Sequence, residues 1–130
     1  MKQKKKQYQD LSIRNIVARF SNKWALLIIL AIYENNILRY TQLMRQIPGI
    51  SSKALTNTLR VLEADNLVNR TIYREIPIRV EYKLTKTGLS LVPTIQSLVD
   101  WAVLNMKAII KHREEYEAKE KASVKLDNHR

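Results

Sequence analysis

The sequence predicts a mainly helical α+β fold with one small β-hairpin, built as a single compact domain. Only two glycines and three prolines interrupt the 130 residues, and long stretches of Leu, Ile, Val and Ala between them favour helices. Two runs of β-type residues, 67–73 and 80–84, lie close together and predict the hairpin. A chain of this length that is 45% apolar fits one core.

Three segments are expected along the chain. Residues 1–10 form a basic flexible arm with nothing apolar to bury, which either reaches nucleic acid or stays a solvated tail. Residues 11–110 form the folded domain. Residues 111–130, with six basic and five acidic side chains, form a charged tail that is expected to fray.

The first two predicted helices provide much of the apolar surface. Apolar residues recur at helical spacing from Leu11 to Phe20, which indicates a short amphipathic helix. Asn22 is placed to cap a second helix, from Lys23 to about Glu34. That helix is apolar on nearly every side, so we expect it in the centre of the core.

A short strand and two further helices come next. Ile37–Leu38 suits a very short strand, and a third helix opens at Arg39–Thr41 and stops at the Pro48–Gly49 turn. Ser51 then caps a fourth helix through its side-chain oxygen. The inward-facing row of the fourth helix is Leu55, Leu59 and Leu62.

After the hairpin, a long final helix closes the folded domain. Thr85 is placed to cap this helix. Apolar residues spread widely around it, more than one small core would bury. The order of helices, tight turn, helix and hairpin predicts a winged helix-turn-helix with additional N- and C-terminal helices.

The outer face of the fourth helix is the main candidate for contact with DNA. Arg and Lys pair with guanine edges in the major groove, and Asn pairs with adenine. The alternative is an ordinary solvated helix face. The candidate residues are Ser51, Ser52, Lys53, Thr56, Asn57 and Arg60.

A second group of residues is placed to contact the DNA backbone. It combines the starts of two helices with arginines of the hairpin, which would touch phosphates or a flanking minor groove. The alternative is that the hairpin arginines only keep the exposed tip solvated and contact no DNA. The residues of this group are Lys23, Arg39, Tyr40, Thr41, Arg74 and Arg79.

Charge supports a polyanionic partner. The chain has 23 basic and 12 acidic residues, a net charge of +11, and residues 1–60 hold 11 basic against 2 acidic side chains. Neutralising phosphates releases counterions and favours binding of any sequence. Charge alone also fits RNA, an acidic lipid surface, or a basic protein with no such partner.

Other classes of protein find little support. Without cysteine there is no disulfide, thiolate nucleophile or cysteine-based metal site. His112 and His129 lie in the charged tail, no Gly-rich phosphate loop occurs, and Ser51 is explained as a cap. We therefore expect no enzyme, metal or cofactor. No uncharged apolar run approaches the roughly 18 residues of a membrane span, so a cytoplasmic protein without membrane contact is expected.

Several ordered motifs resemble the HxlR-type transcription regulators. They are Asn22–Ile28, Arg39–Leu43, Ile47–Ser51 with the leucines that follow, and then Leu67–Arg70, Arg79–Tyr82 and Leu84–Gly88 with Pro93. The match covers roughly residues 11–104. The resemblance implies a homodimer that binds operator DNA, with the first and last helices as its N- and C-terminal dimerisation helices. Oxidant-sensing members of the family carry a cysteine where this chain has Leu11, so thiol switching does not carry over.

A homodimer would also cover the apolar surface of the terminal helices. Trp101 has an alternative place against the first helix of its own chain. Two-fold symmetry predicts a pseudo-palindromic operator. The alternative function is that of a nonspecific, nucleoid-type protein that coats nucleic acid. A small-molecule effector is compatible with this function, but no polar cluster in the sequence identifies a binding site for it. The expected interface residues are Leu11, Ile13, Ile16, Leu98, Trp101, Ala102 and Asn105.

Overall fold

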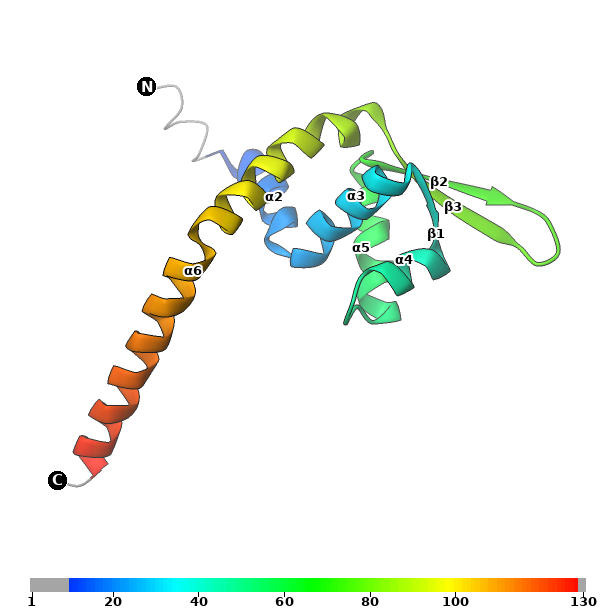
Figure 1. Ribbon diagram of the computed structural model, residues 1–130. Coiled ribbons are helices and arrows are strands. Elements are labelled where there is room, and N and C mark those ends of the chain that lie inside the picture. The colour runs from blue at the N-terminus through cyan, green and yellow to red at the C-terminus, as the bar shows by residue number, and fades with distance from the viewer. Residues whose placement is uncertain (1–9, 129–130) are drawn as a thin grey trace. The chain divides into compact units, whose positions relative to one another are not determined.

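The computed structural model describes residues 10–128 and is drawn in Figure 1. The described residues divide into two compact units, residues 10–95 and 96–128. Among residues 10–128, the first unit contains the three strands and all helices except the distal part of the last one. Of the predicted basic arm, residues 1–9 lie outside the described residues, as do 129–130 of the predicted tail.

Two capped helices open the first unit. Helix α2 (Leu11–Ala18) begins where Asp10 Oδ1 accepts a hydrogen bond from the Ser12 N–H at 2.8 Å, and a 3-10 turn, η1 (Arg19–Ser21), follows. Helix α3 (Lys23–Asn35) begins where Asn22 Oδ1 accepts from the Trp24 N–H at 2.9 Å. The predicted Asn22 cap is confirmed.

The next helices form a helix-turn-helix. Strand β1 (Ile37–Arg39) leads into α4 (Tyr40–Gln46), and the turn that follows contains Gly49 at φ 82°, a conformation that glycine adopts without steric cost. Helix α5 (Ser52–Ala64) starts where the Ser51 hydroxyl oxygen accepts from the Ala54 N–H at 3.0 Å. This confirms the predicted cap.

The hairpin belongs to a three-stranded antiparallel sheet. Strands β2 (Val68–Tyr73) and β3 (Arg79–Leu84) pair directly, and β1 pairs with the other edge of β3, giving the order β1-β3-β2. Leu38 of β1 lies opposite Tyr82 of β3, and both are buried. The sheet and the helix-turn-helix together form the predicted winged helix-turn-helix fold.

Helix α3 lies at the centre of the core. It contacts α5, β1, β3 and α4, while α5 contacts β2, and Figure 1 shows the three helices close together near β1, with the hairpin extending away from them. The predicted inward row Leu55, Leu59 and Leu62 is buried, which fixes the rotation of α5. Thr58 is buried with them, and its hydroxyl donates to the Ala54 carbonyl at 2.7 Å.

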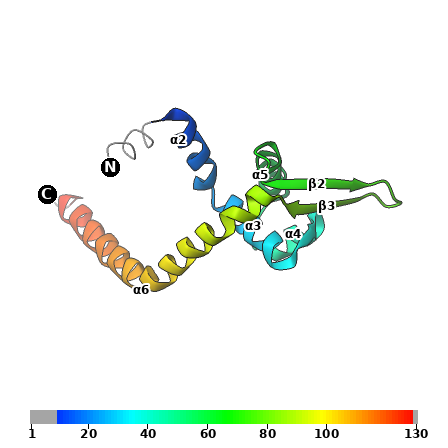
Figure 2. The same ribbon diagram turned by 90° about the horizontal axis from the view of Figure 1, so that it is seen from above.

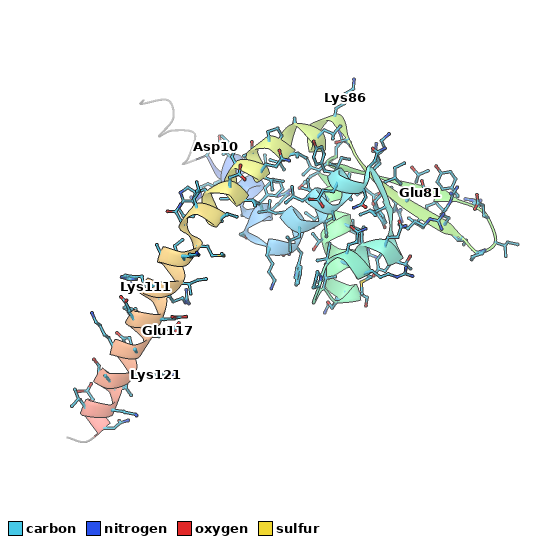
Figure 3. The ribbon with its side chains drawn as sticks, in the orientation of Figure 1. Asp10, Glu81, Lys86, Lys111, Glu117 and Lys121 are labelled. Carbon is cyan, nitrogen blue, oxygen red and sulfur yellow. The ribbon has the colours of Figure 1, made fainter. Side chains whose placement is uncertain are left out.

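The last helix, α6 (Lys86–Asn128), is longer than the sequence predicted. The Thr85 hydroxyl accepts from the Gly88 N–H at 3.0 Å, which confirms the predicted cap. Residues 111–128, which the sequence predicted as a charged tail that frays, are helical. This stretch is rich in Lys, Glu and Ala, which favour helix, and Arg113 and Glu117 form an i,i+4 ion pair at 3.2 Å. Figure 3 labels Lys111, Glu117 and Lys121 along it.

Within residues 10–128, no single helix combines the length and apolar composition needed to cross a membrane. The segments Leu11–Ser21 and Lys23–Asn35 meet that test only when taken together across a bend of 74°.

Candidate nucleic-acid interface

Helix α5 has two chemically different sides. Its leucines are buried against the core, whereas Ser52, Lys53, Asn57 and Arg60 are exposed. Lys53, Asn57 and Arg60 recur at helical spacing and therefore share one surface of the helix, and Ser52 lies beside it in the first turn. They offer a hydroxyl at the start of the helix, followed by a cation, an amide and a second cation. This is the arrangement of donors and acceptors that base edges in a major groove can pair with.

Tyr40 connects α4 to the exposed side of α5. Its hydroxyl lies 3.0 Å from the Ser52 carbonyl oxygen and 3.0 Å from Thr56 Oγ1. The sequence predicted Tyr40 as a backbone contact and Thr56 as a base contact. The structure places both hydroxyls in one internal hydrogen-bond pair, half-buried between the helices. Their geometry suits positioning of α5.

Residues Arg39 and Thr41, at the start of α4, are both exposed. The Arg39 backbone N–H donates to Gln42 Oε1 at 2.8 Å, which holds the first turn of α4. A groove of about 310 Å³ runs from residues 39–41 to residues 75–80 of the hairpin. The start of α4 therefore lies between the exposed side of α5 and the hairpin.

The two arginines of the hairpin are in different environments. Arg74 is exposed. The Arg79 guanidinium bonds Glu75 Oε1 and Glu81 Oε1, each at 3.2 Å, and lies 4.0 Å from the centroid of the Tyr73 ring. Figure 3 labels Glu81 on the hairpin. Arg79 is therefore engaged inside the hairpin, and its buried Nε has no hydrogen-bond partner there.

Lys23 and Tyr82 lie at the margins of the site. Lys23, at the start of α3, is exposed, and its ammonium nitrogen lies 4.5 Å from the centroid of the Trp24 ring. Burial raises the pKa of the Tyr82 phenol above its ordinary value, and the nearby Arg70 opposes this rise. Tyr82 is thus a neutral core residue of the sheet.

The terminal helices leave the predicted interface residues mostly uncovered. In the first unit, α2 has no buried residue, and Leu11 is 69% exposed. In the second unit, Trp101 is 56% exposed and Asn105 Nδ2 donates to the Trp101 carbonyl at 2.9 Å. The other predicted residues, Ile13, Ile16, Leu98 and Ala102, are exposed as well.

Comparison with known proteins decides the family. Residues 19–110 match the model of the HxlR-like helix-turn-helix family. This chain belongs to that family. An uncharacterised HTH-type transcriptional regulator of Halalkalibacterium halodurans is 38% identical over 104 residues, which are 80% of this chain and 92% of the relative.

Solved structures agree with the HxlR-like assignment. The YtfH transcriptional regulator of Salmonella typhimurium has a TM-score of 0.71 and 33% identity, over 78% of this chain and 89% of that one. A regulator assigned to the MarR family, from Porphyromonas gingivalis W83, has a TM-score of 0.66 and 39% identity, over 74% and 93%. The HxlR-like chain is therefore a DNA-binding winged helix-turn-helix transcription regulator, which is not a class of enzyme.

The sequence did not reveal two features of the HxlR-like site. The bond from Tyr40 to Thr56 joins residues 16 positions apart, and no spacing rule predicts such a contact. The Arg79 ion pairs did have a signal, since Glu75 and Glu81 flank it at four and two positions. Side chains two apart on a strand share a face, so the pair with Glu81 was accessible from the sequence.

Proposed function

We propose that this regulator binds a specific operator as a homodimer and acts there as a repressor or an activator of transcription. The observation that carries the proposal is the exposed polar side of α5, whose opposite side is fixed in the core by buried leucines. A rigid helix holds its side chains in the geometry that base recognition needs.

The proposed roles follow from exposure and existing bonds. Lys53, Asn57 and Arg60 contact base edges, because their side chains are free of the core. Tyr40 and Thr56 position α5 through their shared hydrogen bond. Ser51 and Ser52, at the start of α5, lie beside these base contacts. The residues assigned to contacts with DNA phosphates are Lys23, Arg39, Thr41 and Arg74, and all six side chains are exposed.

The dimer is part of the proposal. Exposed apolar residues on α2 and along α6 between Leu98 and Ile110 would leave a lone chain with much uncovered apolar surface. A two-fold axis would present two copies of α5 to successive major grooves, roughly 34–36 Å apart. The expected operator is therefore an inverted repeat, and a protein that acts on the genome in this way works in the cytoplasm.

A nonspecific nucleic-acid-coating protein is the second candidate, favoured by the net charge of +11. Such a protein needs cations on its surface but no particular side chains on α5. Selection of bound fragments from random duplex DNA separates the two candidates. The operator proposal expects enrichment of one inverted repeat and a symmetric footprint; no enrichment after several rounds would favour the coating protein.

A further inference from the structure

The loop at the end of the hairpin is apolar and uncovered. Ile76 is fully exposed and Ile78 is 71% exposed, with Pro77 between them. Two views at right angles show this loop standing clear of the helices of the same unit (Figures 1 and 2). Water-exposed isoleucines at a protruding tip gain nothing for folding, so the tip is suited to an external partner.

The tip is continuous with the candidate DNA surface. Residues 76–78 line the same groove as Arg39 and Thr41, at the start of α4. Tyr40, between these two, bonds the first turns of α5. The exposed residues thus run from α5 across α4 to the hairpin loop, and Arg74 adds a cation beside the tip. This positive margin favours a duplex over an apolar partner.

The stem of the hairpin is braced just behind the tip. Arg79 bonds Glu75 on one side and Glu81 on the other, and stacks on Tyr73 across the hairpin. These contacts join both strands immediately before and after the loop. They also pair both carboxylates with one cation, which lessens the repulsion of phosphates by these two glutamates. The tip is therefore presented on a stem of fixed shape.

We propose that Ile76 and Ile78 enter the minor groove beside the half-site read by α5 and wedge between two base pairs, bending the duplex. The inference rests on the proposed operator binding and extends it. Proteins that insert apolar side chains into the minor groove unstack a base step and kink the DNA. Here, removal of two isoleucines from water offsets that cost.

The wedge makes the tip a determinant of specificity without hydrogen bonds to bases. Pyrimidine–purine steps such as TA and CA/TG unstack more easily than A-tracts. The operator is therefore expected to carry a flexible step where each hairpin lands, outside the bases that α5 contacts. Replacing that step by an A-tract should weaken binding about tenfold, the cost typical of one mismatched base pair.

The test uses the full chain and the operator selected from random duplex DNA. End-labelled operator reports bending by energy transfer, and 2-aminopurine placed at each flanking step reports unstacking. The wild-type protein should bend the duplex and raise 2-aminopurine fluorescence at one step per half-site. The Ile76→Ser/Ile78→Ser double variant should bind about tenfold more weakly, protect the same central bases, and leave the DNA straight.

Ile37→Ser, which changes an exposed isoleucine on β1, is the matched control and should keep the bend. Wild-type protein that recognises the operator but leaves it straight would overturn the wedge, and so would a double variant that bends it normally. A double variant that instead loses binding to lipid vesicles or self-association, with unchanged bending, would also overturn it. Absence of any selected operator would refute the proposed function itself.

Discussion

Tyr40 is a residue whose role only the folded chain reveals. Its hydroxyl bonds one carbonyl and one hydroxyl of α5, both at 3.0 Å. A half-buried hydrogen bond of this kind contributes about 0.5–1.5 kcal/mol net. Tyr40 thereby ties the start of α4 to the helix that carries the candidate base contacts.

Tyr40→Phe removes that hydroxyl and keeps the ring. We expect the free energy of unfolding to fall by about 1 kcal/mol, measured by urea denaturation. Operator affinity should fall as well, since α5 loses one fixed point. Tyr33→Phe, at an exposed tyrosine of α3, is the control, and an equal loss in both variants would contradict the assigned role.

Gly88 is set by close packing. A Cβ at this position would lie 2.2 Å from the Leu67 carbonyl oxygen, far inside van der Waals contact. Alanine in a helix is ordinarily favoured over glycine by about 0.5–1 kcal/mol. The clash reverses this preference, because the neighbouring group is backbone and cannot turn away.

Gly88→Ala is therefore expected to destabilise the protein by about 1–3 kcal/mol, the usual cost of overpacking. Thermal unfolding followed by circular dichroism measures the effect. Thr87→Ala, one position earlier and exposed, should change stability little. A Gly88→Ala protein as stable as the wild type would show that α6 does not pack tightly on residue 67.

At the scale of elements, local signals predicted the helix starts well. Asn22, Ser51 and Thr85 each accept the capping hydrogen bond that their position implied, because a cap depends on residues only two or three apart. The pairing of β1 with β3 depends instead on burying Leu38 against Tyr82, 44 positions along the chain. No local rule contains that information.

The C-terminal end of α6 shows that the apolar pattern alone is not sufficient to predict a helix. Residues 111–128 have no apolar stripe, which suggested fraying, yet they are helical. Helix propensity and the Arg113–Glu117 pair outweigh the missing amphipathic pattern there. For the candidate site, exposure of Lys53, Asn57 and Arg60 followed directly from the leucine periodicity. The ion pair of Arg79 with Glu81 had a signal in the sequence, but its contact with Tyr73 across the hairpin required the folded structure.

The hairpin yields a prediction about two arginines. Arg79→Gln leaves Glu75 and Glu81 without their shared cation, so the stem loosens; operator affinity should fall about tenfold while the dependence on salt stays the same. Arg74→Gln should instead reduce the slope of log K against log salt by about one, as loss of one phosphate contact does. Fluorescence anisotropy at several salt concentrations distinguishes the two variants. Equal salt slopes for both would contradict the different roles assigned to Arg74 and Arg79.

At the scale of the whole molecule, apolar exposure on the terminal helices predicts self-association. Trp101→Asp places a charge on the proposed interface and should yield monomers in analytical ultracentrifugation at concentrations where the wild type is dimeric. Val124→Asp, at an exposed position beyond the family match, is the control. A dimer unaffected by Trp101→Asp would place the interface elsewhere.

The most direct measurement compares Lys53→Ala, Arg60→Ala and Arg39→Ala on the selected operator and on random duplex DNA. If α5 offers its polar side to bases, the first two changes cost about 1–3 kcal/mol on the operator and little on random DNA. Arg39→Ala should weaken both equally and flatten the salt slope by about one. Equal losses on both DNAs for all three variants would contradict base recognition by α5.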